Sequence, residues 1–308
     1  MRHVVRFSTG ITSWLAARRT VEAHGTDRLK LLFADTLAED EDNYRFLIDG
    51  AADVFGVPLA DVADLSADAR ATPPLESSDL AARKAHLADL RGRTAARLPG
   101  LAWIADGRTP FEVFHDERFL GNSRLDPCSK ILKRELCDRW HREHCDPAET
   151  VCVFGLDWTE PHRVSKLRAM FEANGWRTDF PLTREPLLPK TFILSQAWAR
   201  GLNTPRLYEY RVKHANCGML CCKMGQAQAK ELLAAFPERY AYGERREESL
   251  RAYLGKDVSM LTDRRGGTGK KPLTLRQFRE RLQSTGEYDA CDAGGCACFV
   301  GSLGEETE

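Results

Sequence analysis

The stretch Val4-Val5-Arg6-Phe7-Ser8-Thr9-Gly10-Ile11-Thr12-Ser13 decides how this chain is expected to fold. A short apolar run of strand type ends in a turn of Ser, Thr and Gly, and a helix-forming run follows from Trp14. The first backbone N–H groups of a helix have no partner within it, and the helix dipole places partial positive charge there, so a small-residue turn lets an anion approach. The stretch therefore predicts either a phosphate-binding turn or an ordinary strand–turn–helix with Thr12 as N-cap. Four hydroxyl groups can add donors to the turn, those of Ser8, Thr9, Thr12 and Ser13.

Strand-like and helix-like segments alternate along much of the chain. Apolar strand patterns cover residues 4–7, 29–34 and 150–156, and helical patterns follow them at 13–24, 40–55 and 161–174. Gly25 and Gly56 stand just beyond the first two helices, where glycine commonly ends a helix. Helices between strands are typical of parallel crossovers, so we predict an α/β fold with a doubly wound, mainly parallel sheet.

In such a sheet, ligands bind outside the carboxyl ends of the strands. This rule selects three loops as a candidate site: Ser8 to Ser13, Asp35-Thr36, and Gly155-Leu156-Asp157. Asp157 is a candidate Mg²⁺ ligand beside a triphosphate. The Asp35-Thr36 loop is followed by the acidic run Glu39 to Asp42. A second interpretation is therefore that the acidic residues of this loop cap the next helix and interact with its dipole.

Composition limits the class of protein. The 308 residues are 43% hydrophobic, enough for one large core with a smaller appended region. We expect a nucleotide-binding α/β domain over residues 1–200, with a helical excursion at about 62–109, and a cysteine-rich C-terminal region over 201–308. Lys and Arg number 45, as do Asp and Glu, so no overall basic field attracts nucleic acid, although local contact with RNA or DNA is not excluded. Because the sequence has no apolar run near the ~20 residues of a membrane span, we expect a cytoplasmic protein without membrane contact.

The chain has 10 cysteines, and in a reducing compartment this favours metal ligation or thiol chemistry over disulfides. Cys137, Cys145 and Cys152 lie in apolar or helical segments and are expected to be structural. Cys128 is the candidate reactive thiol, because Asp126 and Pro127 are typical of a helix N-cap and first helical position.

The dipole of that helix and its lysines favour a thiolate at Cys128. We therefore expect Cys128 and Lys130 to be catalytic and Lys133 to bind the nucleotide. The alternative is an inert buried thiol at position 128.

Close thiols on glycine-bearing turns recur in two clusters further along. Several sulfurs must converge on one centre to hold zinc or an iron–sulfur cluster, and separate short-spaced clusters can supply them. The spacings are looser than a paired Cys-x-x-Cys signal, so unligated thiols remain the alternative. The candidate metal ligands are Cys217, Cys221, Cys296 and Cys298.

Together these motifs resemble the PP-loop ATP pyrophosphatase superfamily, and within it the phosphoadenosine phosphosulfate (PAPS) reductase-like family. The first turn is similar to the family pattern Ser-Gly-Gly-x-Asp-Ser, with Thr9 in place of the first glycine and Thr12 in place of the aspartate. The resemblance implies an adenine nucleotide alpha hydrolase-like fold and places the Asp35-Thr36 loop near the ribose and base. Other residues follow the order seen in the family: Cys128-x-Lys130 with Lys133, Pro186, Trp198, Pro205, Leu207-Tyr208 and Cys217 to Cys221.

The resemblance implies three possible functions. In the first, ATP with Mg²⁺ adenylates a nucleobase or similar small-molecule acceptor, and sulfur then arrives from a donor protein or a cluster. In the second, the pocket holds a sulfonucleotide that is reduced to sulfite with thioredoxin as partner, although the chain lacks the Glu-Cys-Gly-Leu-His type segment of genuine reductases. In the third, the protein is a non-catalytic nucleotide-binding module.

Overall fold

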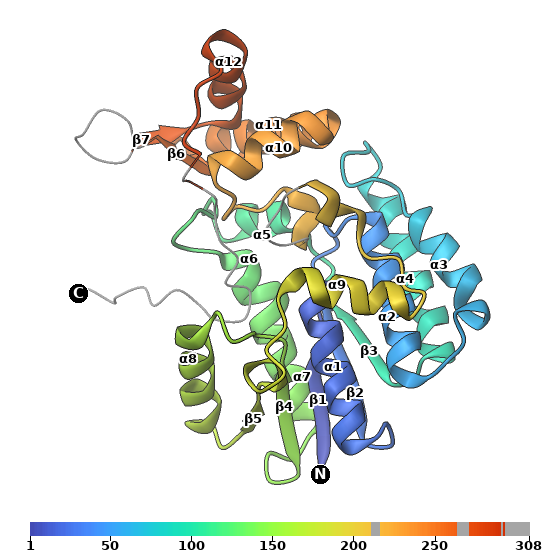
Figure 1. Cartoon of the computed structure of the whole chain (residues 1–308). Coiled ribbons are helices and arrows are strands. Elements are labelled where there is room, and N and C mark those ends of the chain that lie inside the picture. Colours follow the sequence, from blue (N-terminus) through green and yellow to red (C-terminus); the bar gives the residue numbers. More distant parts are fainter. Residues whose placement is uncertain (211–215, 264–270, 291, 293–308) are drawn as a thin grey trace.

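The computed structural model describes residues 1–210, 216–263, 271–290 and 292. Its centre is a parallel sheet with the strand order β3-β2-β1-β4-β5 (Figure 1). Every pairing within this sheet is parallel, which confirms the predicted α/β class. The strands are β1 (Arg2–Arg6), β2 (Leu29–Asp35), β3 (Leu101–Ala105), β4 (Thr150–Phe154) and β5 (Arg177–Asp179).

Helices account for most of the other described elements. The first begins at Ile11 with Gly10 as its N-cap, so the interpretation of Thr12 as N-cap is wrong. Those around the sheet are α1 (Ile11–His24), α2 (Glu41–Phe55), α3 (Ala63–Arg70), α4 (Leu80–Arg97), α5 (Pro110–Asp116), α6 (Pro127–Ser129), α7 (Leu136–His144), α8 (Pro161–Glu172) and α9 (Lys190–Ala199). The C-terminal ones are α10 (Gln226–Ala235), α11 (Pro237–Leu254) and α12 (Leu275–Thr285), which accompany the antiparallel pair β6 (Leu261–Asp263) and β7 (Lys271–Leu273).

Successive residues of the strands face two different helical layers, as the pleat requires. Val5 and Leu31 belong to the cluster that includes α1 and α2, whereas Val4 and Leu32 pack with α7 on the other face. Cys152 extends this second face toward α8. Helices therefore cover both faces, and the sheet is doubly wound. This is why the strands have nearly continuous apolar sequences.

Two strands were not expected from the sequence. β3 lies inside the segment predicted as a helical excursion, and it pairs with β2 from Leu31 to Asp35. β5 has only three residues and pairs with β4 at the edge of the sheet. The excursion itself holds α3 and α4, and it ends before residue 101.

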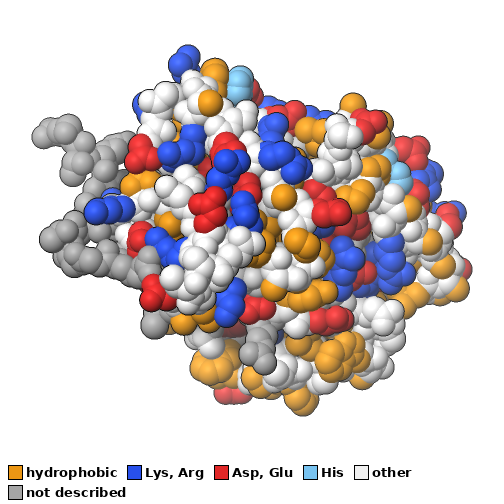
Figure 2. Space-filling view, turned by 90° about the horizontal axis from the view of Figure 1, so that it is seen from above, with side chains coloured by type: hydrophobic (Ala, Val, Ile, Leu, Met, Phe, Trp, Pro, Cys, Tyr) orange, Lys and Arg blue, Asp and Glu red, His pale blue; other side chains and the backbone are white. Residues whose placement is uncertain are grey.

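The C-terminal helices lie beyond the carboxyl ends of the strands (Figure 1). Their apolar cluster is shared with the earlier part of the chain, because Phe111, Phe114 and Cys128 pack with Tyr240 and Phe278. On the face seen in Figure 2, basic and acidic side chains intermingle. None of the helices within the described ranges combines the length and apolar character needed to cross a bilayer.

A buried ion-pair network joins the N-terminus of α2 to the C-terminal region. Asp40 caps α2 by accepting the N–H of Asp42 at 3.0 Å. Its carboxylate also accepts two hydrogen bonds from Arg206, at 2.9 and 2.8 Å, and one from Arg239 of α11 at 2.9 Å. Arg239 further pairs with Glu41 at 3.3 Å. The capping interpretation of the acidic run therefore matches the structure, and the run also fixes the C-terminal region in place.

Candidate functional site

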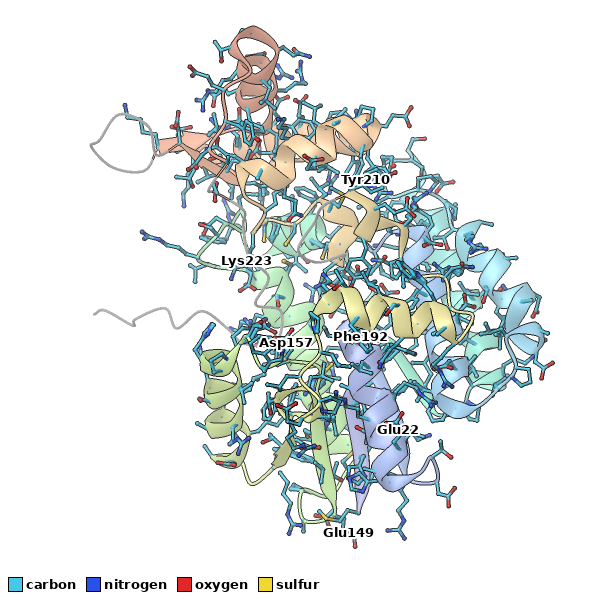
Figure 3. All side chains as sticks on the ribbon, in the orientation of Figure 1. Glu22, Glu149, Asp157, Phe192, Tyr210 and Lys223 are labelled. Carbon is cyan, nitrogen blue, oxygen red and sulfur yellow. The ribbon has the colours of Figure 1, made fainter. Side chains whose placement is uncertain are left out.

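The carboxyl ends of β1 and β4 form the topological switch point of the sheet. From β1 the chain adds β2 and β3 on one side, whereas β4 and β5 lie on the other side. Figure 3 shows Asp157 at this edge of the sheet and Glu149 at the opposite edge. Two of the three predicted loops, the one after β1 and the one after β4, therefore meet where a doubly wound sheet commonly binds its ligand.

The turn after β1 is held by its own hydroxyl groups. Ser13 Oγ accepts the N–H of Ser8 at 3.1 Å and lies 2.8 Å from the carbonyl oxygen of Gly10. Ser8 Oγ accepts the N–H of Gly10 at 3.2 Å. Thr9 is buried, and its hydroxyl has no hydrogen-bond partner among the described residues, whereas Thr12 is half-buried. Ser8 and Ser13 thus preorganise the turn, and the Thr9 hydroxyl is left unsatisfied.

Gly155 packs directly against the first turn of α1. A Cβ atom at this position would lie 2.7 Å from Ser13 Cα and 2.8 Å from Ser13 N, closer than real Cβ contacts. The neighbouring atoms belong to backbone, so they cannot rotate away as a side chain would. Gly155, predicted as a nucleotide-binding residue, therefore sets the position of the α1 N-terminus.

We expect Gly155→Ala to separate the β4 loop from α1, lowering the free energy of unfolding by about 1–3 kcal/mol, as overpacking typically does. Gly92→Ala is the matched control, because a Cβ at Gly92 meets nothing within 4 Å in the exposed face of α4. That control should be neutral or stabilising by up to about 1 kcal/mol, since alanine favours helix. Urea denaturation of both variants measures the difference, and equal stabilities would contradict the packing argument.

A tyrosine distant in sequence contacts the same turn. The Tyr208 hydroxyl accepts the N–H of Ile11, the first residue of α1, at 3.0 Å. Lys190, the first residue of α9, places its Nζ 4.3 Å from the centroid of the Tyr208 ring. Burial lowers the pKa of Lys190, and the negative charge of Asp157 opposes that shift. Asp157 itself is half-buried and accepts the N–H of Thr159 at 2.8 Å.

The loop after β2 faces the protein interior. Asp35 is fully buried, and its carboxylate accepts hydrogen bonds from the Leu37 N–H at 2.7 Å, the Tyr44 hydroxyl at 2.8 Å and the Trp103 indole at 3.0 Å. Burial raises the pKa of Asp35. Thr36 is also buried, 3.5 Å from Glu39 Oε1. Both carboxylate oxygens of Asp35 therefore accept hydrogen bonds from within the core. That Asp35 and Thr36 lie beside a ribose stays a prediction.

Cys128 lies in α6, which continues as a π-helical turn over Lys130–Glu135 and then as α7. The π turn places Lys133 in the interior, whereas Lys130 is exposed and pairs with Glu135 at 3.7 Å. Asp126 is the N-cap by position, but its side chain makes no capping hydrogen bond and faces Lys223 at 3.7 Å instead. Single π turns are frequent at functional sites. The structure brings Lys133, and not Lys130, into the buried cluster.

The thiols of Cys128, Cys217, Cys221 and Cys222 contact one another in this region. Cys128 Sγ lies 3.9 Å from Cys222 Sγ, and both side chains are buried. Thiol contacts with Cys128 and Cys221, together with burial, raise the pKa of Cys222. A thiol contact with Cys221 and burial likewise raise the pKa of Cys217. Cys222 is the cysteine that faces Cys128, a choice between Cys221 and Cys222 that the sequence leaves open.

Glu39 connects the thiol region to the end of β2. Its carboxylate accepts the backbone N–H of Cys217 at 2.7 Å and lies 3.4 Å from Lys133 Nζ. Cys217 and Met219 have positive φ angles of 52° and 70°, and Leu37, just before Glu39, has one of 58°. Such conformations cost of order 1–3 kcal/mol each and concentrate at functional sites. The buried Glu39–Lys133 pair holds this strained segment against the sheet.

The two halves of the candidate site are joined by the 3₁₀ segment Arg206–Tyr210. Tyr208 bonds to the N-terminus of α1, while its neighbour Leu207 belongs to the apolar cluster that contains Cys128 and Cys222. In Figure 3, Lys223 and Tyr210 lie beyond the carboxyl edge marked by Asp157. Residues 207 and 208 therefore link the phosphate-type turn to the apolar cluster that contains the thiol pair.

The described residues do not by themselves complete the predicted metal site. Within the ranges the structure covers, no group of three or more His, Cys, Asp or Glu side chains is arranged to hold a metal ion. Cys217 and Cys221 lie together, but Cys296 and Cys298 lie outside the described residues. The chain reaches Asp292 beside the start of α10, where its carboxylate accepts the N–H of Gln226 at 3.2 Å.

The structural cysteines follow the sequence prediction in part. Cys137 and Cys152 are fully buried, and burial raises the pKa of Cys152 to about 12. Cys145 is only half-buried. Cys137 and Cys152 therefore have no access to a ligand at the carboxyl edge.

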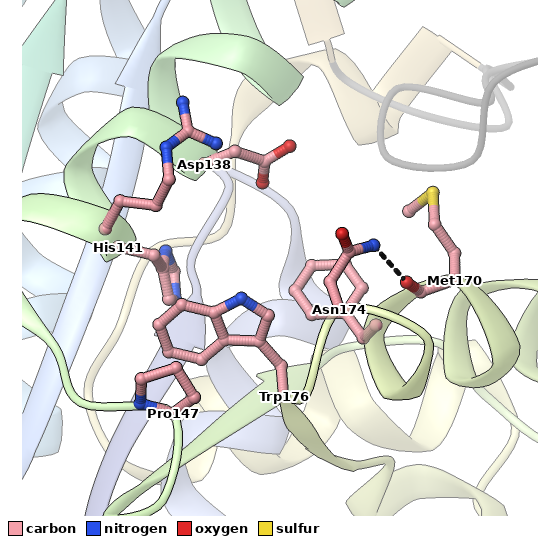
Figure 4. A pocket seen from close by; sticks show the side chains of 8 residues that line it. Asp138, His141, Pro147, Met170, Asn174 and Trp176 are labelled. Atoms are coloured by element: carbon pink, nitrogen blue, oxygen red, sulfur yellow. Dashed lines mark hydrogen bonds between the residues drawn. The ribbon is translucent and has the colours of Figure 1, made fainter.

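A separate hollow of about 340 Å³ lies between α7, α8 and β5 (Figure 4). It is lined by Asp138, His141, Arg142, Pro147, Met170, Phe171, Asn174 and Trp176. The buried His141 donates from Nδ1 to the carbonyl of Cys137 at 2.9 Å. Burial, and then the charge of Arg6, lower the pKa of His141 to about 2.

His141 is expected to make folding sensitive to mild acid. Its pKa in the folded chain lies below the unfolded value near 6.5, so only the unfolded state gains a proton as the pH falls from 7 to 5. The free energy of unfolding should therefore be about 2 kcal/mol lower at pH 5 than at pH 7 because of His141. Denaturation of wild type and His141→Phe at both pH values measures this term, and an identical pH dependence in the two proteins would contradict it.

Comparison of the chain with models of protein families, with curated proteins and with solved structures found no match.

Proposed function

We propose that this protein is an adenine nucleotide-dependent sulfur-transfer enzyme of the PP-loop kind. The observation that carries the proposal is the buried Cys128–Cys222 pair, whose sulfur atoms lie 3.9 Å apart. The segment Leu207-Tyr208 links the apolar cluster around this pair to the N-terminus of α1, where an anion could bind. A nucleotide phosphate chain fits the preorganised turn from Ser8 to Ser13, because helix N-termini attract anions. Asp157 would hold Mg²⁺ beside the phosphates, as single carboxylates commonly do in such sites.

The chemistry divides into two steps. A carbonyl oxygen of the acceptor attacks the α-phosphorus of ATP, so that the acceptor becomes adenylated and pyrophosphate leaves. A persulfide on Cys128, supplied by a sulfur-donor protein, then attacks the activated carbon and displaces AMP. Cys222 lies close enough to attack the Cys128 sulfur, which releases the thiolated acceptor and leaves a Cys128–Cys222 disulfide for an external thiol to reduce.

A zinc ion or iron–sulfur cluster on Cys217, Cys221, Cys296 and Cys298 stays part of the proposal, without a role in these steps. When bound, such a group would tie the C-terminal cysteines to the thiol region. Iron, zinc and sulfide analysis of anaerobically purified protein, beside Cys296→Ser and Cys298→Ser variants, tests the ligand set. Unchanged metal content in both variants would remove them from it.

One observation favours a second candidate, a sulfonucleotide reductase. Two thiols in contact can supply two electrons by forming a disulfide, which is what sulfite release requires. In that case the same nucleotide pocket holds the sulfonucleotide itself, and thioredoxin reduces the disulfide.

Product analysis separates the candidates. Purified protein incubated with ATP, Mg²⁺, a persulfide donor and candidate nucleobase acceptors should release AMP and pyrophosphate in equal amounts with the thiolated acceptor. Sulfite formed only from sulfonucleotide and thioredoxin would favour the reductase. Nucleotide binding without turnover in either assay would favour a non-catalytic module.

A further inference from the structure

Tyr208 places a half-buried hydroxyl donor at the start of α1. Its hydroxyl oxygen already accepts the N–H of Ile11 at 3.0 Å, so its own hydrogen is available to a second group. No acceptor for that hydrogen is found among the described residues. Burial raises the pKa of Tyr208 to about 12, so the group is a neutral hydroxyl at neutral pH. An acceptor that lies beside the helix N-terminus could therefore receive this hydrogen.

Lys190 supplies positive charge at the same place. Its ammonium nitrogen lies 4.3 Å from the centroid of the Tyr208 ring. Gly10 lies directly beneath the hydroxyl, because a Cβ on Gly10 would approach Tyr208 Oη to 3.4 Å. The Tyr208 hydroxyl therefore lies at the N-terminus of α1, with the Lys190 ammonium beside the Tyr208 ring, although both residues are far from the turn in sequence.

We propose that Tyr208 and Lys190 are ligands of the phosphate chain, and that they select nucleotides carrying a pyrophosphate group. The inference rests on the proposed function for the identity of the nucleotide. The Tyr208 hydroxyl donates to a phosphate oxygen while it keeps its bond to Ile11, and Lys190 neutralises charge on the adjacent phosphate. Adenosine, which lacks phosphate, gains nothing from either residue.

Titration calorimetry with inorganic pyrophosphate tests the inference. We expect Tyr208→Phe and Lys190→Gln each to weaken pyrophosphate binding by about tenfold or more, as loss of a hydrogen bond to a charged group does. Tyr253→Phe is the matched tyrosine control, since Tyr253 is exposed and stacks on His115. Lys30→Gln is the lysine control, since Lys30 donates to the carbonyl of Pro99 away from the site. Both controls should bind pyrophosphate as wild type does.

The outcomes separate this inference from the proposed function. Equal pyrophosphate affinity in wild type, Tyr208→Phe and Lys190→Gln would overturn the inference, as would a wild-type protein that binds Mg²⁺-ATP but not pyrophosphate. Absence of binding to any adenine nucleotide would overturn the proposed function. If Lys190→Gln unfolds, Lys190→Arg keeps the charge and should bind within about threefold of wild type. A tenfold loss in Lys190→Arg that leaves its melting temperature unchanged would contradict a purely ionic role.

Discussion

Replacing Cys128 with serine is expected to lower the rate of sulfur transfer by about a thousandfold or more, because a hydroxyl cannot carry the persulfide sulfur. Binding of Mg²⁺-ATP should stay within about twofold of wild type, since no direct contact of Cys128 with the turn is found among the described residues. Cys222→Ser should release one equivalent of AMP per chain and then stop, because the thiolated acceptor stays joined to Cys128 through a disulfide. Rapid-quench measurement of AMP and thiolated product gives both rates.

Cys145→Ser is the matched control for these variants. Cys145 is half-buried, lies at the end of α7 and contacts none of the four cysteines of the thiol region that the structure describes. Its replacement should leave both the first turnover and the steady state unchanged. Full activity in Cys128→Ser would remove the thiol pair from the mechanism and favour a cluster-borne sulfur.

Arg239→Ala is expected to lower the free energy of unfolding by about 3–5 kcal/mol. The side chain of Arg239 is 2% exposed and bonds to Asp40, Glu41 and Glu76 within 3.3 Å. Its removal leaves buried carboxylates with too few partners, which is more costly than never burying them. Arg70→Ala is the comparison, because Arg70 is 53% exposed and pairs with Asp42 at 3.4 Å, so its loss should cost about 1 kcal/mol or less. Chemical denaturation measures both values.

Measuring the stability of wild type and Arg239→Ala at acid pH tests whether the loss comes from the pairing of Arg239 with Asp40. Burial would raise the pKa of Asp40, but the hydrogen bonds and charges of Arg206 and Arg239 outweigh it, so the pKa is lowered. The stability contribution of Asp40 is then present above its unfolded pKa near 4 and is lost as the pH falls below that value. Arg239→Ala should lose less stability between pH 5 and pH 3 than wild type. A larger acid loss in the variant would contradict the assignment.

The order of the first strand, turn and helix was predictable because the signals are local. The apolar run at 4–7, the small-residue turn and the glycine stops at Gly25 and Gly56 all act within a few residues. β3 was missed because its five residues follow a long helix-forming segment, and only pairing with β2 reveals them as a strand. β5 was missed because three residues carry too little pattern.

Strand β3 also explains why the burial of Asp35 is not evident from the sequence. Its carboxylate is satisfied in part by Trp103, which belongs to β3, so the burial of Asp35 could not be inferred without that strand. The contacts of Cys128 with Cys222 and of Tyr208 with Ile11 span 94 and 197 residues. No local pattern predicts such pairs from one sequence. Nor does a local pattern show which lysine faces inward, because a π turn over Lys130–Glu135 places Lys133 in the interior.

Whether an adenine nucleotide binds at the switch point between β1 and β4 is settled by calorimetric titration of Mg²⁺-ATP into wild type and Gly155→Ala. We predict saturable binding of one nucleotide per chain to wild type, and clearly weaker binding to the variant, because Gly155 sets the position of the α1 N-terminus. No measurable affinity of folded wild type for any adenine nucleotide would contradict the proposed function.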